Sequence, residues 1–251
     1  MVYFVGAGCG APDLITVRGR SLIEAADVLI YAGSLVNPAL LDYAKPSCDI
    51  HDSARLTLPE VIALMQQAET AGKMTVRLHT GDPCVYGAIR EQMDALAALG
   101  IGYEICPGVS AFCGAAASLR AEYTLPEVSQ TVIITRMAGR TPVPERESIR
   151  SLAAHRSTMV IFLSTGLLPA LTEELIAGGY PPETPAAIVY KASWPDEQVH
   201  RCTVADLAET AARHGITRMA LITVGEFLGD DYALSKLYDA SFSTGYREAK
   251  P

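Results

Sequence analysis

The chain has 251 residues, of which 49% are hydrophobic and 19% charged, and its formal net charge is -8. This composition supplies enough apolar material for one large core or two smaller ones, and it excludes a disordered chain. The negative charge disfavours a nucleic-acid partner, because phosphates would be repelled unless a local basic stripe compensated. The sequence shows no such stripe.

The apolar stretches are interrupted by glycine, proline or charge well before the roughly 18 residues that a membrane-spanning helix needs. Met1 to Val5 run directly into a strand pattern, without the basic leader and apolar segment of a secretory signal. We therefore expect a soluble, cytoplasmic protein with no membrane partner. The six cysteines form no C-x-x-C pair and have no histidine at zinc-ligand spacing, so we expect buried, reduced thiols and no metal site.

Short β-branched runs alternate with amphipathic helical patterns, which indicates parallel strands joined by helical crossovers. In the first half we expect strands near residues 2–5, 28–31, 48–50, 74–79 and 103–105. Helices are expected at 16–25, after Thr57 and from Ile89 to Leu99. Thr57 and Glu60 have the spacing of a capping box, and Gly72 and Gly100 follow the last two helices.

The periodicity lapses between residues 119 and 130, and a new strand begins at 131–135. We place a domain boundary there, which divides the chain into residues 1–120 and 121–251. In the second half, strands are expected at 159–163, 186–190, 198–202 and 220–224, and helices at 168–177 and 204–214. The expected fold class is α/β, with two α/β domains built on mainly parallel or mixed sheets.

The first strand leads into Gly6-Ala7-Gly8-Cys9-Gly10-Ala11-Pro12-Asp13. A glycine-rich turn between a strand and a helix lets the backbone approach a ligand closely. The dinucleotide fingerprint requires G-x-G-x-x-G and an acidic residue at the end of the second strand. Here the third glycine is one position early and the second strand ends in Tyr31-Ala32-Gly33, so a dinucleotide cofactor is disfavoured.

Two further turns follow strands. Thr80-Gly81-Asp82-Pro83-Cys84-Val85-Tyr86-Gly87 comes after the strand at 74–79, and Cys106-Pro107-Gly108-Val109-Ser110-Ala111 comes after the next, with Ser110 placed to cap the following helix. Loops at the carboxyl ends of strands are where open α/β sheets bind ligands. Taken singly, each turn is also compatible with ordinary loop chemistry.

Together and in this order, the three turns resemble those of the tetrapyrrole methylase family, and the resemblance continues at residues 158–163, 185–189 and 223–226. Segments 31–36 and 237–242 resemble the branch that methylates precorrin-4, or its cobalt form, at C-11 in cobalamin biosynthesis. The resemblance implies S-adenosylmethionine as donor, bound in a cleft between the two domains, a tetrapyrrole as substrate, and a homodimer.

Residue by residue, the resemblance assigns donor contacts to loop positions: Pro12, Thr80, Gly81, Asp82, Val85, Ser110, Ala111, Leu163 and Ala192. Asp82 is also the candidate for tuning charge at the reaction centre, and capping of its own turn is the alternative. His79 and His51 lie at strand ends and are candidates for proton handling, although either is also compatible with a partly buried structural role.

Precorrins carry many carboxylates, so a negatively charged chain must bind them with local cations. The candidates near strand ends or in loops are Arg55, Arg77, Arg136 and Arg140, whereas we expect Arg18, Arg20 and Arg213 on solvated helix surfaces. Methyl transfer from a sulfonium is a direct displacement, for which positioning suffices and no covalent nucleophile is needed. Two alternatives stay open: a related methylase acting on another ring carbon, and a non-catalytic tetrapyrrole carrier, which would not need the donor loops.

Overall fold

The computed structural model describes residues 1–250 and divides into two compact units. The first unit comprises Met1–Ala115 together with Lys191–Glu197. The second comprises Ala116–Tyr190 and the residues from Gln198 onward. The division falls inside helix α4 (Ala111–Leu119), a few residues before the boundary expected at 120/121, and the return of segment 191–197 to the first unit was not foreseen from the sequence.

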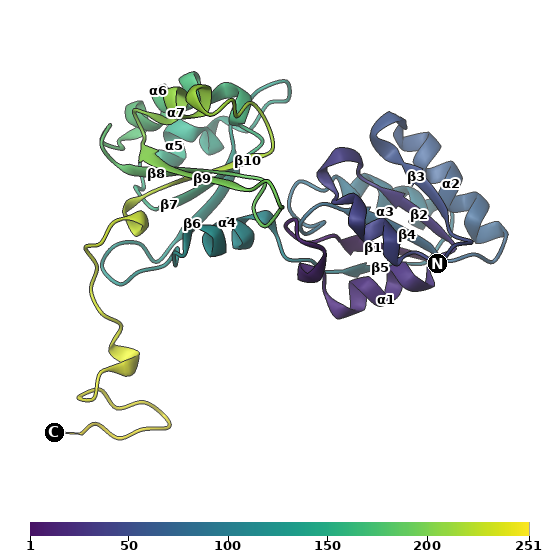
Figure 1. The fold of residues 1–251 in the computed structure, drawn as a ribbon, viewed down its shortest axis with the longest axis horizontal. Coiled ribbons are helices and arrows are strands. Elements are labelled where there is room, and N and C mark those ends of the chain that lie inside the picture. The colour runs from purple at the N-terminus through teal and green to yellow at the C-terminus, as the bar shows by residue number, and fades with distance from the viewer. Residues whose placement is uncertain (251) are drawn as a thin grey trace. The chain divides into compact units, whose positions relative to one another are not determined.

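The first unit is built on a five-stranded parallel sheet with the order β3-β2-β4-β1-β5 (Figure 1). Its strands are β1 (Val2–Gly6), β2 (Val28–Tyr31), β3 (Asp49–Asp52), β4 (Thr75–His79) and β5 (Tyr103–Cys106). Helices α1 (Val17–Ala25), α2 (Leu58–Thr70) and α3 (Ile89–Ala98) connect them, and α4 follows β5. Because parallel strands point the same way, the loops after β4, β1 and β5 emerge side by side at one edge of the sheet.

Both faces of this sheet are covered. Phe4 and Ile30 pack with Met65 of α2 and Leu96 of α3 on one face, whereas Val5 packs in a second cluster on the other. Alternation along each strand sends successive side chains to opposite faces, which explains why the sequences of β1 and β2 are almost entirely apolar.

The second unit contains a mixed sheet with the order β6-β7-β10-β8-β9 (Figure 1). Its strands are β6 (Val132–Arg136), β7 (Thr158–Phe162), β8 (Pro185–Tyr190), β9 (Gln198–Thr203) and β10 (Ala220–Val224). Only the β6–β7 pair is parallel among these neighbours. Helices α5 (Ile149–Ala153), α6 (Leu168–Gly178) and α7 (Leu207–Arg213) bury their apolar residues against the sheet in a single core.

All ten expected strands are found, each within about two residues of its expected ends. The Thr57–Glu60 interaction also forms: the Thr57 backbone N–H and hydroxyl both donate to the Glu60 carboxylate at 2.7 Å. The expectation of buried thiols is wrong for Cys84 and Cys113, which lie exposed after β4 and within α4, although all six cysteines are free. No helix among residues 1–250 is long and apolar enough to cross a membrane.

Candidate functional site

The loops that follow β1 and β4 are joined by backbone hydrogen bonds. Gly8 and Gly81 exchange two of them: Gly8 N donates to Gly81 O at 3.2 Å, and Gly81 N donates to Gly8 O at 2.9 Å. Ala7 N also donates to His79 O at 2.7 Å. An isolated antiparallel bridge therefore holds the first two loops together just beyond the ends of the parallel β1–β4 pair.

Gly6 lies where all three loops meet. A Cβ atom at this position would lie 2.5 Å from the Cα of Gly108 and 2.6 Å from the carbonyl oxygen of Gly81. Both contacts are with backbone, which cannot move aside as a flexible side chain can. The closeness of the loops therefore requires glycine at position 6.

The Asp82 carboxylate ties the second loop to the third. One of its oxygens accepts from Cys84 N at 2.8 Å, within its own turn, and the other accepts from Gly108 N at 2.9 Å. Partial burial alone would raise the pKa of Asp82, but the hydrogen bonds from Cys84 and Gly108 lower that pKa below its usual range. Asp82 is therefore a carboxylate at neutral pH, and it fixes the relative positions of two loops.

The segment Lys191–Glu197 packs against the first loop. Ser193 Oγ accepts from Ala11 N at 2.9 Å and lies 3.4 Å from Cys9 Sγ. Gly10 allows the approach, because a Cβ there would lie 2.5 Å from Ala192 O. These contacts bury Ala192, which the resemblance assigned to the second domain but which the structure groups with the first unit.

Replacing Ser193 by alanine is expected to lower the free energy of unfolding by about 1–2 kcal/mol, because the Ala11 N–H loses its acceptor. Urea denaturation of wild type and variant measures the difference. Ser21→Ala on the exposed face of α1 is the matched control and should change stability by less than about 0.5 kcal/mol. Equal losses in the two variants would contradict the role given to Ser193.

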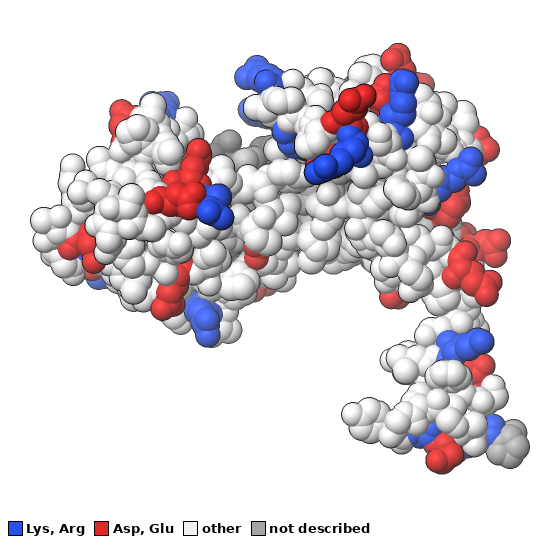
Figure 2. All heavy atoms as spheres, turned by 180° about the vertical axis from the view of Figure 1, so that it is seen from behind, with Lys and Arg blue, Asp and Glu red and all other residues white. Residues whose placement is uncertain are grey.

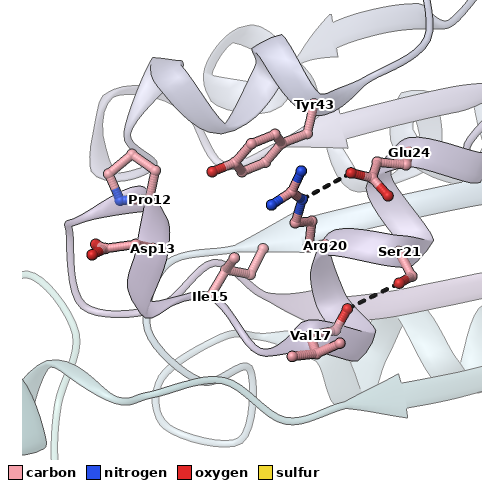
Figure 3. Close-up of a pocket in the computed structure, with 8 residues that line it drawn as sticks. All are labelled: Pro12, Asp13, Ile15, Val17, Arg20, Ser21, Glu24 and Tyr43. Atoms are coloured by element: carbon pink, nitrogen blue, oxygen red, sulfur yellow. Dashed lines mark hydrogen bonds and ion pairs between the residues drawn. The ribbon is translucent and has the colours of Figure 1, made fainter.

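The first loop also borders an open hollow of about 370 Å³, lined by Pro12, Asp13, Ile15, Val17, Arg20, Ser21, Glu24 and Tyr43 (Figure 3). The Arg20 guanidinium lies over the Tyr43 ring, 4.5 Å from its centroid, and Arg20 Nε lies 2.8 Å from Glu24 Oε1. Arg20 is exposed, as expected for a helix surface, but its position is fixed by these two partners.

The other residues expected to contact the methyl donor differ in their surroundings. A side chain on Gly81 would lie 3.4 Å from Ala111 N and 3.5 Å from Ser110 Cα, so the second and third loops are in contact there. Thr80 is exposed and Val85 half-buried. Leu163 lies in the second unit directly after β7, is 66% exposed and has φ +54°, a backbone conformation that is uncommon for leucine.

The four candidate arginines also differ. Arg55 and Arg140 are exposed. Arg136 donates to the carbonyl oxygens of Met137, Thr141 and Pro142, so its guanidinium holds the loop after β6. Arg77 is buried within β4, beneath the second loop.

The two candidate histidines are placed differently as well. His51 lies on the edge strand β3 with its Nε2 3.0 Å from Asp49 Oδ2. His79 is 4% exposed, and burial, assisted by the positive charge of Arg77, lowers its pKa to about 3. His79 is therefore neutral at physiological pH.

On the face that Figure 2 shows, basic and acidic side chains are interspersed among broad uncharged areas. Among residues 1–250, no three His, Cys, Asp or Glu side chains lie close enough to hold a metal ion. The face in Figure 2 presents no continuous basic patch to an acidic ligand.

The joined loops and the two sheets match one known class of protein. The family model of the tetrapyrrole (corrin/porphyrin) methylases matches residues 1–208, and the chain belongs to this family.

Particular members are close in sequence and structure. The chain is 55% identical to the cobalt-precorrin-4 C(11)-methyltransferase of Methanocaldococcus jannaschii, over 99% of this chain and 96% of that protein. The crystal structure of a cobalt precorrin-4 methyltransferase matches with 46% identity and a TM-score of 0.89, covering 91% of this chain and 96% of that one. Uroporphyrin-III C-methyl transferase from Thermus thermophilus, complexed with S-adenyl homocysteine, matches with 27% identity and a TM-score of 0.74, covering 91% and 93%.

Sequence reasoning missed two features of this site. It did not foresee that segment 191–197 would pack on the first loop, although the only tryptophan of the chain, Trp194, lies there. The polar face of β4 was not predicted either: Thr75, Arg77 and His79 alternate with Val76 and Leu78 and form a buried polar row on one face. The period-two alternation in the sequence was the signal.

Proposed function

We propose that this chain transfers a methyl group from S-adenosylmethionine to C-11 of precorrin-4, or of its cobalt form, in cobalamin biosynthesis. The observation that carries the proposal is the junction of the three loops by the Gly8–Gly81 hydrogen bonds and by the Asp82–Gly108 hydrogen bond. The high identity to a C(11)-methyltransferase over nearly the whole chain favours this acceptor carbon over the others.

The loops of the first unit suit S-adenosylmethionine, which is a flexible and polar molecule. Close backbone approach at Gly6 and Gly10 leaves main-chain groups, not side chains, to face a ligand at this edge. In the proposal this surface is supplied by loop residues of the first unit: Pro12, Thr80, Gly81, Asp82, Val85, Ser110, Ala111 and Ala192. Bound S-adenosylmethionine would supply the methyl group of its sulfonium.

Within this proposal, Asp82 acts mainly as a positioning residue. Both of its oxygens already accept backbone N–H groups, so its first effect is to hold the second and third loops at a fixed separation. Displacement at a methyl carbon requires the acceptor, the methyl group and the leaving sulfur to lie in line, and small errors in loop position reduce the rate steeply. Its negative charge also favours a positively charged donor.

The test of the donor site is calorimetric titration with S-adenosylhomocysteine. Wild type is expected to bind it with micromolar affinity, and Asp82→Ala is expected to bind at least about tenfold more weakly, because two charge-assisted hydrogen bonds are lost. Asp94→Ala is the matched control, since Asp94 is an exposed acid on α3 paired with Arg90. Absence of binding to the wild type would discard the donor site.

Assay of wild type with precorrin-4 and with cobalt-precorrin-4 then tests the acceptor. Carbon-13 labelling of the transferred methyl group identifies the ring position by NMR, which separates C-11 methylation from methylation elsewhere. A non-catalytic carrier would bind the tetrapyrrole without needing the donor. We propose a homodimer as the working state, and sedimentation of the purified protein at micromolar concentration measures it.

A further inference from the structure

A hollow of about 280 Å³ in the first unit lies over the buried polar row of β4. Arg77 and His79 lie in it together with Gln92 of α3. Because Arg77 and His79 are two residues apart on a strand, both side chains point to the same face, the one covered by α2 and α3. The second loop contributes Thr80 and residues 85–88 to the wall.

Arg77 is a buried cation without an acidic partner. It is 7% exposed, Nε donates to Gln92 Oε1 at 3.1 Å, and Nη1 donates to Ile30 O at 3.2 Å. Among the side chains that the structure describes, no carboxylate forms an ion pair with Arg77 and no acceptor for its Nη2 is found. A buried charge is normally paired, and one that lines an open hollow without a partner indicates that the partner is a ligand.

The surroundings of His79 also indicate that the hollow binds a ligand. Its Nε2 is buried and has no hydrogen-bond partner among the described residues. The imidazole is neutral at physiological pH, since burial lowers its pKa to about 3, so it adds no charge beside Arg77 and leaves the guanidinium as the cation of the hollow. The exposed Glu91 at the rim is the acidic residue of this lining.

The opposite wall is mainly apolar. Leu56 and Leu58 precede or begin α2, and Val61 follows one turn later, so they present hydrocarbon to the hollow. Gln92 Nε2 donates to Ala88 O at 3.1 Å, which links the Arg77 cluster to the second loop. Tyr86 and Ala88 have φ of 56° and 50°, a strained conformation for both residues that often marks a functional loop.

We propose that this hollow is a subsite for one carboxylate-ended side chain of the tetrapyrrole substrate, with Arg77 as its cation and Leu56, Leu58 and Val61 against its methylene stem. This inference rests on the proposed function, because the ligand of the subsite is the tetrapyrrole substrate. Binding of one carboxylate to Arg77 would fix the orientation of that substrate on the first unit. A guanidinium suits the task because its planar fork matches the two oxygens of a carboxylate.

The test compares Arg77→Gln and Arg77→Lys with wild type, and uses Arg213→Gln, an exposed arginine on α7, as the matched control. Arg77→Gln is expected to raise the KM for precorrin-4 about tenfold to hundredfold with a smaller change in kcat, whereas affinity for S-adenosylhomocysteine stays within about twofold. Arg77→Lys is expected to restore part of the loss. Circular dichroism and melting temperature check that each variant is folded.

A measurement of equilibrium binding distinguishes failure of the subsite from failure of the proposed methyltransferase activity. Uroporphyrin III, a stable tetrapyrrole with eight carboxylates, is titrated by fluorescence, and its affinity is expected to fall about tenfold in Arg77→Gln but not in Arg213→Gln. Folded Arg77→Gln with unchanged KM and unchanged uroporphyrin affinity overturns the subsite while leaving the proposed function intact. Failure of wild type to methylate any tetrapyrrole overturns the proposed function instead.

A second variant covers the case in which neither Arg77 variant folds. Ala32 is half-buried and lines the same hollow, so Ala32→Leu fills part of the space without removing a charge. It is expected to raise the KM and weaken uroporphyrin binding, again with donor affinity preserved. Unchanged binding in folded Ala32→Leu overturns the subsite.

Discussion

Gly6→Ala is expected to lower the free energy of unfolding by about 3 kcal/mol and the melting temperature by roughly 10 °C. The added methyl group would lie within 2.6 Å of backbone atoms from two other loops, Gly81 and Gly108, so relief requires the loops to separate. Separation would stretch the Gly8–Gly81 hydrogen bonds and the Asp82–Gly108 bond. Affinity for S-adenosylhomocysteine is therefore expected to fall at least about tenfold, measured by calorimetry on the folded variant at low temperature.

Gly166→Ala provides the control for this substitution. A Cβ atom on Gly166 would meet nothing within 4 Å, so only the local backbone preference changes. We expect its stability to lie within about 0.5 kcal/mol of wild type and its donor affinity to be unchanged. If Gly6→Ala behaves like Gly166→Ala, the three loops do not depend on their close approach at Gly6.

The elements of the fold could be predicted from the sequence because their signals are local. The β-branched runs at Val28–Tyr31 and Ala220–Val224 define strands whose ends are those expected, and the Thr57–Glu60 pair marks the start of α2. Helix α7 begins at Leu207, not at the expected residue 204, because Val204–Asp206 form a turn closed by Asp206 N donating to Thr203 O. Short α5 has only five residues and gives too little periodicity to predict.

The candidate site could be predicted only in part, because its construction depends on contacts between distant residues. The loops after β1, β4 and β5 were identifiable by their glycines and by Asp82. Nothing local in the sequence states that Ser193 binds Ala11, or that Arg77 lies inside the first unit without an acidic partner. Both facts follow from the order of the strands in the sheet and from the return of segment 191–197, which no local pattern determines.

The burial of His79 makes stability depend on pH in a defined window. Its pKa is about 3 in the folded chain, lowered first by burial and then by the charge of Arg77, against an ordinary value of 6.5. Above pH 6.5 the imidazole is neutral in both folded and unfolded chains, so it contributes no pH dependence there. As the pH falls below 6.5, His79 binds a proton in the unfolded chain but not in the folded chain. Stability is therefore lost progressively until the pH reaches about 3.

His79→Gln is therefore expected to reduce the acid sensitivity of the protein. Each pH unit below about 6 should cost the wild type about 1.4 kcal/mol through this one group, and the variant should lack that component of the slope. Urea denaturation at intervals between pH 7 and pH 5 measures it, with His155→Gln as the control, because His155 is exposed in the turn after α5. Carboxylates contribute equally to all three proteins and cancel in the comparison. If wild type and His79→Gln lose stability in parallel over this range, His79 is protonated in the folded chain at mildly acidic pH, and its burial beside Arg77 is weaker than the structure indicates.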